Sequence, residues 1–120
     1  MSQLTEVLRA LDPYVFVVGS HARGTARPDS DIDLTPRLRP DYDPGADRND
    51  RRSQERMMPE CIEILDGFGI DWNSEIIGYI DFRIEDELIE VCSWMAPLEH
   101  DIPFEVNAVV VAGVPMVALR

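Results

Sequence analysis

Two aspartates separated by a single residue stand at the start of an apolar segment, as Asp31-Ile32-Asp33-Leu34. Because successive side chains of a strand point to opposite faces, both carboxylates are expected on one face, with Ile32 turned into the core. Two carboxylates at this spacing repel each other unless a cation lies between them. Oxygen ligands of this kind suit magnesium, which completes its octahedron with water and phosphate oxygens. The pair therefore predicts a magnesium site.

A glycine-serine turn precedes the aspartates. Gly19 and Ser20 follow an apolar run, and Arg23 stands about one helical turn further along. A glycine between a strand and a helix lets the backbone approach a phosphate closely, and the N–H groups of the turn can bind its oxygens. The Ser20 hydroxyl and the Arg23 guanidinium are additional donors. We therefore expect these three residues to bind phosphates next to the metal site.

Together the two segments resemble the signature of a known superfamily. Gly19-Ser20-His21-Ala22-Arg23-Gly24 is followed, after five residues, by Ser30-Asp31-Ile32-Asp33-Leu34. This order is similar to that of the DNA polymerase β-like nucleotidyltransferases, in particular the minimal nucleotidyltransferase (MNT-type) domain. Outside residues 15–35 the resemblance is one of element order and hydrophobic pattern. It implies an α/β fold with a short mixed sheet and helices packed on one side.

The resemblance also implies an activity, the transfer of a nucleoside monophosphate from an NTP to a hydroxyl group with release of pyrophosphate. ATP is the expected donor, although another NTP stays open. Ser20 and Arg23 would contact the β and γ phosphates, and the aspartates would bind two magnesium ions. In such a two-metal arrangement one ion activates the acceptor hydroxyl, and both neutralise charge on the reacting phosphates.

Members of this superfamily use a third carboxylate from a later strand, usually an aspartate. Glu90 is the best positional match, because its charge interrupts an apolar run over residues 88–92 and needs a partner if buried. We expect it to be both catalytic and metal-binding, although a glutamate departs from the commoner aspartate. Asp81 is the second candidate and Glu105 the third. The alternative is that Glu90 is an acid on the solvent face of an edge strand.

The remaining pattern predicts one domain over residues 1–120, with its first half built around the two motifs. Apolar residues at helical spacing indicate a helix over residues 2–12, and an apolar run over 14–18 indicates a strand covered on both faces. A short helix is expected from Ser20 to before Pro28. A second strand over 31–35 should be cut short by Pro36. Residues 36–53 are polar and read as a flexible loop.

The second half of the chain predicts a helix and two hairpins. Pro59 suits the first turn of the helix, and Gly67 or Gly69 suits its end. Strands over 75–84 and 88–94 are expected to be joined by the turn 85–87, and strands over 106–111 and 114–119 by Ala112-Gly113. The buried stripe of the helix is predicted to consist of four residues: Met58, Ile62, Leu65 and Phe68.

Several other residues favour ordinary structural roles. His21 occupies a variable position of the motif and is expected at the surface. The arginines of residues 37–56 are typical of a solvated face that balances neighbouring aspartates, with contact to a triphosphate as the alternative. Trp72 and Trp94 are expected in the core or at the edge of a cleft. Cys61 and Cys92 lie in apolar contexts without a metal-binding pattern, so both are predicted to be buried, reduced thiols.

Composition restricts the partners. A net charge of -12 and a pI near 4.4 disfavour nucleic acid, because an acidic surface repels phosphates, although tRNA stays open. All 11 cationic side chains are arginines, so mechanisms that need a covalent lysine intermediate are excluded. No segment approaches the roughly 18 apolar residues of a membrane span, and no secretory signal is visible, so we expect a cytoplasmic protein.

Three interpretations of the function follow. In the first, the acceptor is a partner protein, as in toxin-antitoxin systems, because the short chain leaves no room for the acceptor-binding domain of larger relatives. In the second, the chain modifies a cationic small molecule such as an aminoglycoside, with a homodimer completing the pocket and acidic charge steering the substrate. In the third, it is a non-catalytic nucleotide-binding or interaction module.

Overall fold

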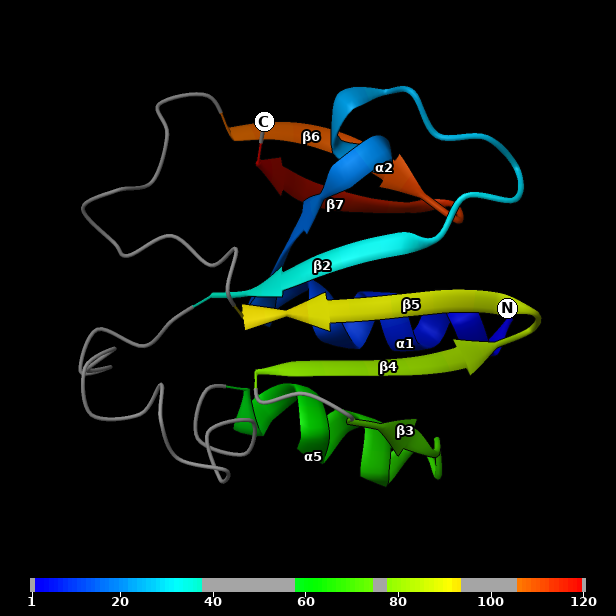
Figure 1. The fold of residues 1–120 in the computed structure, drawn as a ribbon, viewed down its shortest axis with the longest axis vertical. Coiled ribbons are helices and arrows are strands. Elements are labelled where there is room, and N and C mark those ends of the chain that lie inside the picture. The colour runs from blue at the N-terminus through cyan, green and yellow to red at the C-terminus, as the bar shows by residue number, and fades with distance from the viewer. Residues whose placement is uncertain (1, 38–57, 75–77, 94–105, 120) are drawn as a thin grey trace.

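The structure is a computed structural model and describes residues 2–37, 58–74, 78–93 and 106–119. Within these ranges the strands form one mixed sheet in the order β3-β4-β5-β2-β1-β7-β6 (Figure 1). The helices are α1 (Gln3–Leu11), α2 (Gly19–Arg23) and α5 (Pro59–Gly67), and a 3-10 turn, η1, covers Asp12–Tyr14. The strands are β1 (Val15–Val18), β2 (Ile32–Pro36), β3 (Trp72–Asn73), β4 (Tyr79–Ile84), β5 (Glu87–Cys92), β6 (Val106–Val111) and β7 (Val114–Leu119). The predicted α/β fold with a mixed sheet is confirmed.

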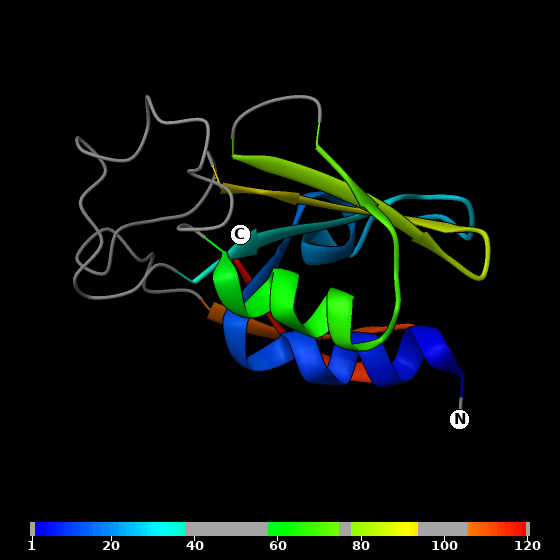
Figure 2. The same cartoon turned by 90° about the horizontal axis from the view of Figure 1, so that it is seen from below.

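The two longer helices pack on the same side of the sheet. Figure 2 shows α1 and α5 side by side beneath the strands, whereas α2 lies in front of β7 in Figure 1. The α1 stripe is predicted from sequence and is buried as Leu4, Val7, Leu8 and Leu11. The Ser2 hydroxyl accepts a hydrogen bond from the Thr5 N–H at 3.2 Å, so Ser2 caps the N-terminus of this helix.

β1 lies inside the sheet, between β2 and β7, and is buried on both faces as predicted. Val15 and Val17 contribute to the main core beneath the helices. Phe16 and Val18 point to the opposite face and form a smaller apolar cluster with Leu119. β1 pairs antiparallel with β2 and parallel with β7, so strands from distant parts of the sequence flank it.

Four details of the first half and the helix differ from the sequence-based expectations. Pro36 is the last residue of β2, opposite Val15, because a strand end tolerates a residue without an N–H. Asp31 precedes β2 and is exposed. In α5 the buried residues are Cys61 and Leu65, with Met58 buried just before the helix and Ile62 partly buried. Phe68 follows the helix and is 37% exposed, because the chain leaves the helical register after Gly67.

The hairpins are confirmed with shifted bounds. The β4–β5 turn consists of Glu85 and Asp86 at positive φ, and Glu87 already belongs to β5. β3 is an additional short edge strand, which pairs antiparallel with β4. Trp72 lies on β3, half-buried against the core, and its indole N–H donates to Asp66 at 3.0 Å. Cys61 is a buried free thiol, as expected, whereas Cys92 is a free thiol that is only half-buried.

Some predictions fall outside the described residues, namely the loop over residues 36–53 beyond Arg37, Trp94 and Glu105. Arg37 itself is half-buried, with its guanidinium 4.4 Å from the centre of the Phe16 ring and donating to the Val15 carbonyl at 3.0 Å. The expectation of a solvated arginine is therefore wrong at this position. Within the described ranges, no helix has the length and apolar character that a membrane span requires.

Candidate active site

Three acidic residues lie in one row across three neighbouring strands. Asp33 of β2 is the register partner of Glu90 on β5, and Glu90 is the register partner of Asp81 on β4. Neighbouring strands are about 4.8 Å apart, so Glu90 is adjacent to Asp33 while Asp81 is about twice as far away. The parallel pairing of β2 with β5 thus brings together two of the predicted residues and places Asp81 one strand beyond them.

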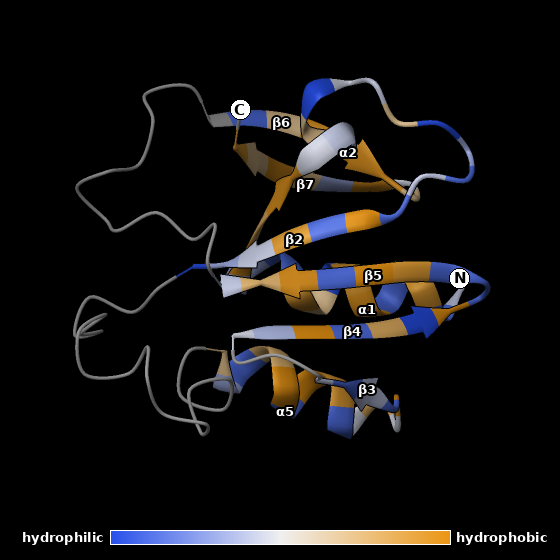
Figure 3. Ribbon diagram, viewed as in Figure 1, coloured by the Kyte–Doolittle hydropathy of each residue, from blue (hydrophilic) through white to orange (hydrophobic). Residues whose placement is uncertain are grey.

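The row stands on the face of the sheet opposite α1 and α5. Along β2, β5 and β4 hydrophilic and hydrophobic residues alternate (Figure 3), and the apolar neighbours of each acid are fully or nearly fully buried. These neighbours are Ile32 and Leu34, Ile89 and Val91, and Ile80 and Phe82. Because adjacent side chains point to opposite faces, burial of these six residues directs the carboxylates of Asp33, Glu90 and Asp81 outward, where they are half-buried.

Gly19 contacts the Asp33 end of the row. It follows β1 directly and has φ +73°, a left-handed conformation that glycine adopts without strain. A Cβ at this position would overlap Asp33 Oδ2 and lie 3.2 Å from both Cβ and Cγ of Asp33. The absence of a side chain at Gly19 is therefore what allows the turn and the carboxylate to come this close.

The other motif residues extend from the same turn. Ser20 and His21 are half-buried on α2, and Arg23 is exposed at its end. The predicted surface position of His21 is wrong in one respect, because its Nε2 atom is buried and has no hydrogen-bond partner within the described part of the chain. The motif therefore brings a hydroxyl, an imidazole and a guanidinium to the side of the row where Asp33 lies.

The carboxylates of the row repel one another. Burial, followed by the charge of Asp31, raises the pKa of Asp33, while His21 and Arg23 act in the opposite direction. Burial raises the pKa of Glu90 as well, and the charges of Asp33, Asp31 and Asp81 add to this effect. Positive charge placed among these groups would relieve the repulsion.

Asp31 acts on the row although it lies outside β2. It is exposed and precedes the strand, so the predicted placement of both aspartates on one strand is wrong. Within the described ranges, no group of three or more His, Cys, Asp or Glu side chains stands ready to enclose a metal ion. The chemistry of the side chains nevertheless fits a hard divalent cation. Half-buried carboxylates with raised pKa values lie side by side, next to groups that can donate hydrogen bonds to a phosphate.

Tyr79 is a site residue that the sequence analysis did not identify. It stands two residues before Asp81 on β4 and diagonally across from Glu90 of β5, on the same face of the sheet. Burial and these two carboxylates raise its pKa to about 12. Because every second residue of a strand lies on the same face, the position of Asp81 could have pointed to Tyr79, but only the β4–β5 register places it near Glu90.

A buried threonine ties the two acid-bearing strands together. The Thr35 side chain is completely buried, and its hydroxyl donates to the Cys92 carbonyl at 2.8 Å. This bond joins β2 to β5 two residues beyond Asp33 and Glu90. It therefore supports the register on which the row depends.

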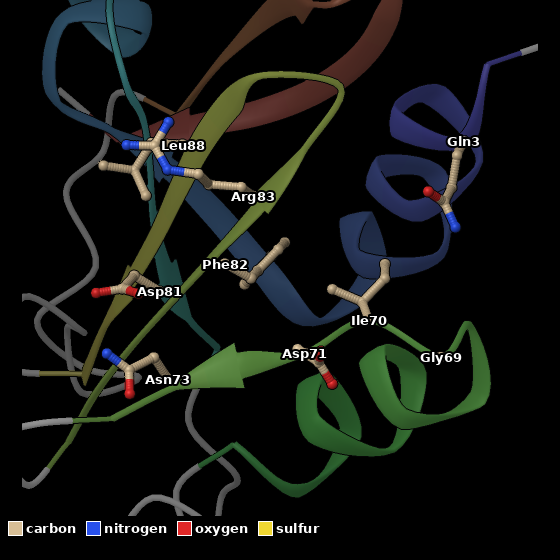
Figure 4. A pocket seen from close by; sticks show the side chains of 9 residues that line it. All are labelled: Gln3, Gly69, Ile70, Asp71, Asn73, Asp81, Phe82, Arg83 and Leu88. Carbon is tan, nitrogen blue, oxygen red and sulfur yellow. The ribbon is translucent and has the colours of Figure 1, made fainter.

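A hollow of about 490 Å³ opens at the far end of the row, beside Asp81 (Figure 4). It lies beside β3, whose two residues pair with Phe82 and Asp81 of β4. Polar and apolar groups share its lining, which consists of Gln3, Gly69, Ile70, Asp71, Asn73, Asp81, Phe82, Arg83 and Leu88. The row thus extends from the Gly19 turn at one end to this hollow at the other.

Comparison with known families agrees with this arrangement. Residues 1–102 match the sequence model of a family that is described as "Nucleotidyltransferase domain". The chain therefore belongs to the nucleotidyltransferase domain family, consistent with the polymerase β-like superfamily. No curated protein and no solved structure matches the chain significantly.

Proposed function

We propose that this nucleotidyltransferase moves AMP from ATP onto a hydroxyl group of a partner protein, with magnesium bound at the carboxylate row. Membership of the family supports nucleotidyl transfer as the general activity. The finer proposal is carried by one observation, the pairing of Asp33 with Glu90 directly beside the Gly19 turn. A triphosphate at the turn would have its α-phosphate next to this pair.

Each residue has a role that follows from its chemistry. The Ser20 hydroxyl and the Arg23 guanidinium donate hydrogen bonds to the β and γ phosphates, and Gly19 leaves room for them. Asp33 and Glu90, with Asp31 beside them, hold magnesium. When bound, the metal supplies positive charge for the reacting phosphates and lowers the pKa of the acceptor hydroxyl.

The transfer is a substitution at the α-phosphorus. The acceptor hydroxyl oxygen forms a bond to this atom, and the bond from the α-phosphorus to the oxygen bridging it to the β-phosphate breaks. Pyrophosphate leaves with the electron pair of that bond, held by Ser20 and Arg23. The hydroxyl proton passes to a carboxylate of the row, which is within reach of any group seated beside Asp33.

Charge supports a protein acceptor. The chain carries a net charge of -12, which attracts a basic protein surface and repels a polynucleotide. A partner encoded beside this chain, as in toxin-antitoxin pairs, is the acceptor that we propose. The free thiols of Cys61 and Cys92 suit the reducing cytoplasm as the setting.

The test is label transfer with the purified chain, magnesium and ATP labelled at the α-phosphate. We expect label on the protein encoded by the neighbouring gene, no transfer from ATP labelled at the γ-phosphate, and loss of transfer on chelation. Asp33→Asn and Glu90→Gln should each abolish transfer. Asp86→Asn, at an exposed turn position with φ 69°, is the matched control and should retain it.

Three results would contradict the proposal in different ways. Label on an aminoglycoside in place of a protein would indicate a small-molecule acceptor. Tight nucleotide binding without turnover would indicate a binding module. Full activity of Asp33→Asn would mean that the row is not the metal site.

A further inference from the structure

Tyr79 lies on the same face of the sheet as the carboxylate row. It is two residues from Asp81 on β4, so both side chains point away from the helices, and Glu90 stands opposite Asp81 on β5. Tyr79 pairs with Cys92, so Glu90 is its diagonal neighbour on the adjacent strand, within reach of a long aromatic side chain. We propose that Tyr79 is a positioning residue, whose hydroxyl holds the Glu90 carboxylate in the orientation that binds a divalent cation beside Asp33. This inference rests on the proposed metal-dependent transfer.

The backbone of Tyr79 is firmly anchored. The carbonyl of the preceding residue, Gly78, accepts two hydrogen bonds from Ser93, one from its N–H and one from its hydroxyl, each at 2.8 Å. Ser93 is buried and directly follows β5, and Tyr79 pairs in register with Cys92. The backbone from which the ring extends is thus fixed relative to the strand that carries Glu90, which is what a positioning group requires.

The hydroxyl keeps its proton at neutral pH. A tyrosine hydroxyl is protonated at neutral pH at its ordinary pKa of about 10, so the group can act as a hydrogen-bond donor. A phenol has one proton and donates it to one acceptor at a time. Asp81 and Glu90 are the two acceptors on this face, and the Tyr79 hydroxyl would reach the Glu90 carboxylate from the side away from Asp33, which leaves the side facing Asp33 open for a cation.

Glu90 has more need of such a restraint than Asp33. A glutamate side chain has one more rotatable bond than an aspartate, so more conformational freedom must be removed before its carboxylate can bind a metal. The Asp33 carboxylate is already confined by contact with the Gly19 turn. A tyrosine that fixes Glu90 would compensate for the longer side chain at the third acidic position.

The test measures Mn²⁺ affinity by electron paramagnetic resonance on the full chain without nucleotide. Tyr79→Phe removes only the hydroxyl and should weaken Mn²⁺ binding about 10-fold, as is typical when a partner of a metal ligand is lost. Tyr14→Phe is the control, because Tyr14 is 41% exposed on η1, at the end of β1 opposite the Gly19 turn; the Mn²⁺ affinity of this variant should be unchanged. Equal affinity of Tyr79→Phe and wild type would overturn the proposal.

A double-variant cycle separates positioning from a general structural effect. If Tyr79 acts through Glu90, the variant Tyr79→Phe/Glu90→Gln should bind Mn²⁺ as weakly as Glu90→Gln alone. Two independent losses that multiply would overturn the proposal. The cycle also distinguishes failure of the metal site from failure of the role of Tyr79. Wild-type Mn²⁺ affinity in Glu90→Gln would refute the metal site itself. Weaker Mn²⁺ binding by Glu90→Gln, with unchanged binding by Tyr79→Phe, would refute only the role of Tyr79.

A measurement on the wild-type protein tests the proposal even if Tyr79→Phe does not fold. With 3-fluorotyrosine incorporated, the ¹⁹F resonance assigned to Tyr79 should shift on addition of Mg²⁺, and the shift should be absent in Glu90→Gln. The resonance of Tyr14 should not move in either protein. A Tyr79 resonance that is insensitive to Mg²⁺ in the wild type would overturn the proposal.

Discussion

Replacing Gly19 by alanine separates the two demands that the turn makes on this residue. The first is conformational, because a non-glycine residue in the left-handed region costs about 1–2 kcal/mol. The second is spatial, because the new Cβ would overlap Asp33 Oδ2. The obstructing atom is the end of a short side chain, so we expect the Asp33 carboxylate to rotate away rather than the fold to yield. The free energy of unfolding should therefore fall by about 1–2 kcal/mol, while metal-dependent transfer should fall at least about 10-fold.

Gly113→Ala is the matched control for this experiment. Gly113 has φ +79° in the β6–β7 turn, and nothing lies within 4 Å of its added Cβ. Urea denaturation should give both variants a similar loss of stability, and label transfer from ATP should remain near wild type only in Gly113→Ala. Wild-type transfer by Gly19→Ala would refute the reasoning, since it would mean that the position of the Asp33 carboxylate beside the turn does not matter.

Three further outcomes are expected. First, the pKa values of Asp33 and Glu90 are raised, so the folded state binds these protons more tightly than the unfolded state. The two groups therefore lower the free energy of unfolding as pH rises from their ordinary pKa values of 3.8 and 4.5 through the raised ones. Urea denaturation across this range should show a smaller decline for Asp33→Asn than for wild type, and an equal decline would contradict it. Second, Thr35→Val leaves the Cys92 carbonyl without its buried donor and should cost about 1–3 kcal/mol in the same assay, whereas the exposed Thr25→Val should cost little. Third, Mg²⁺ should raise the melting temperature of wild type but not of Asp33→Asn; equal shifts in thermal denaturation would point to a different binding site.

Much of the fold was predictable, because the relevant signals are local. The α1 stripe repeats at helical spacing, and the continuous apolar run of β1 indicates burial on both faces. The resemblance also led to Glu90, as a third acid on a later strand, but its register opposite Asp33 is a finding of the structure. These predictions needed only periodicity, turn residues and one long motif.

The remaining features depend on tertiary contacts. β3 has two residues, which is too short for any alternation, and exists because it pairs with β4. The buried side of α5 contains Cys61 in addition to the expected Leu65, because the angle at which the helix packs decides which neighbours of the stripe are covered. Tyr79 joins the site only through the register of β4 with β5, a relation that no local pattern encodes.

The parallel contact of Val17 with Ala118 has a consequence for the order in which the molecule is completed. During synthesis β1 leaves the ribosome about a hundred residues before β7, the strand that covers one of its two edges. Until then the edge of β1 leading into the Gly19 turn has no partner, and long-range pairings of this kind form late and slowly. A nascent chain halted before β7 should therefore lack a stable Gly19 turn, although every residue of that turn has already been made.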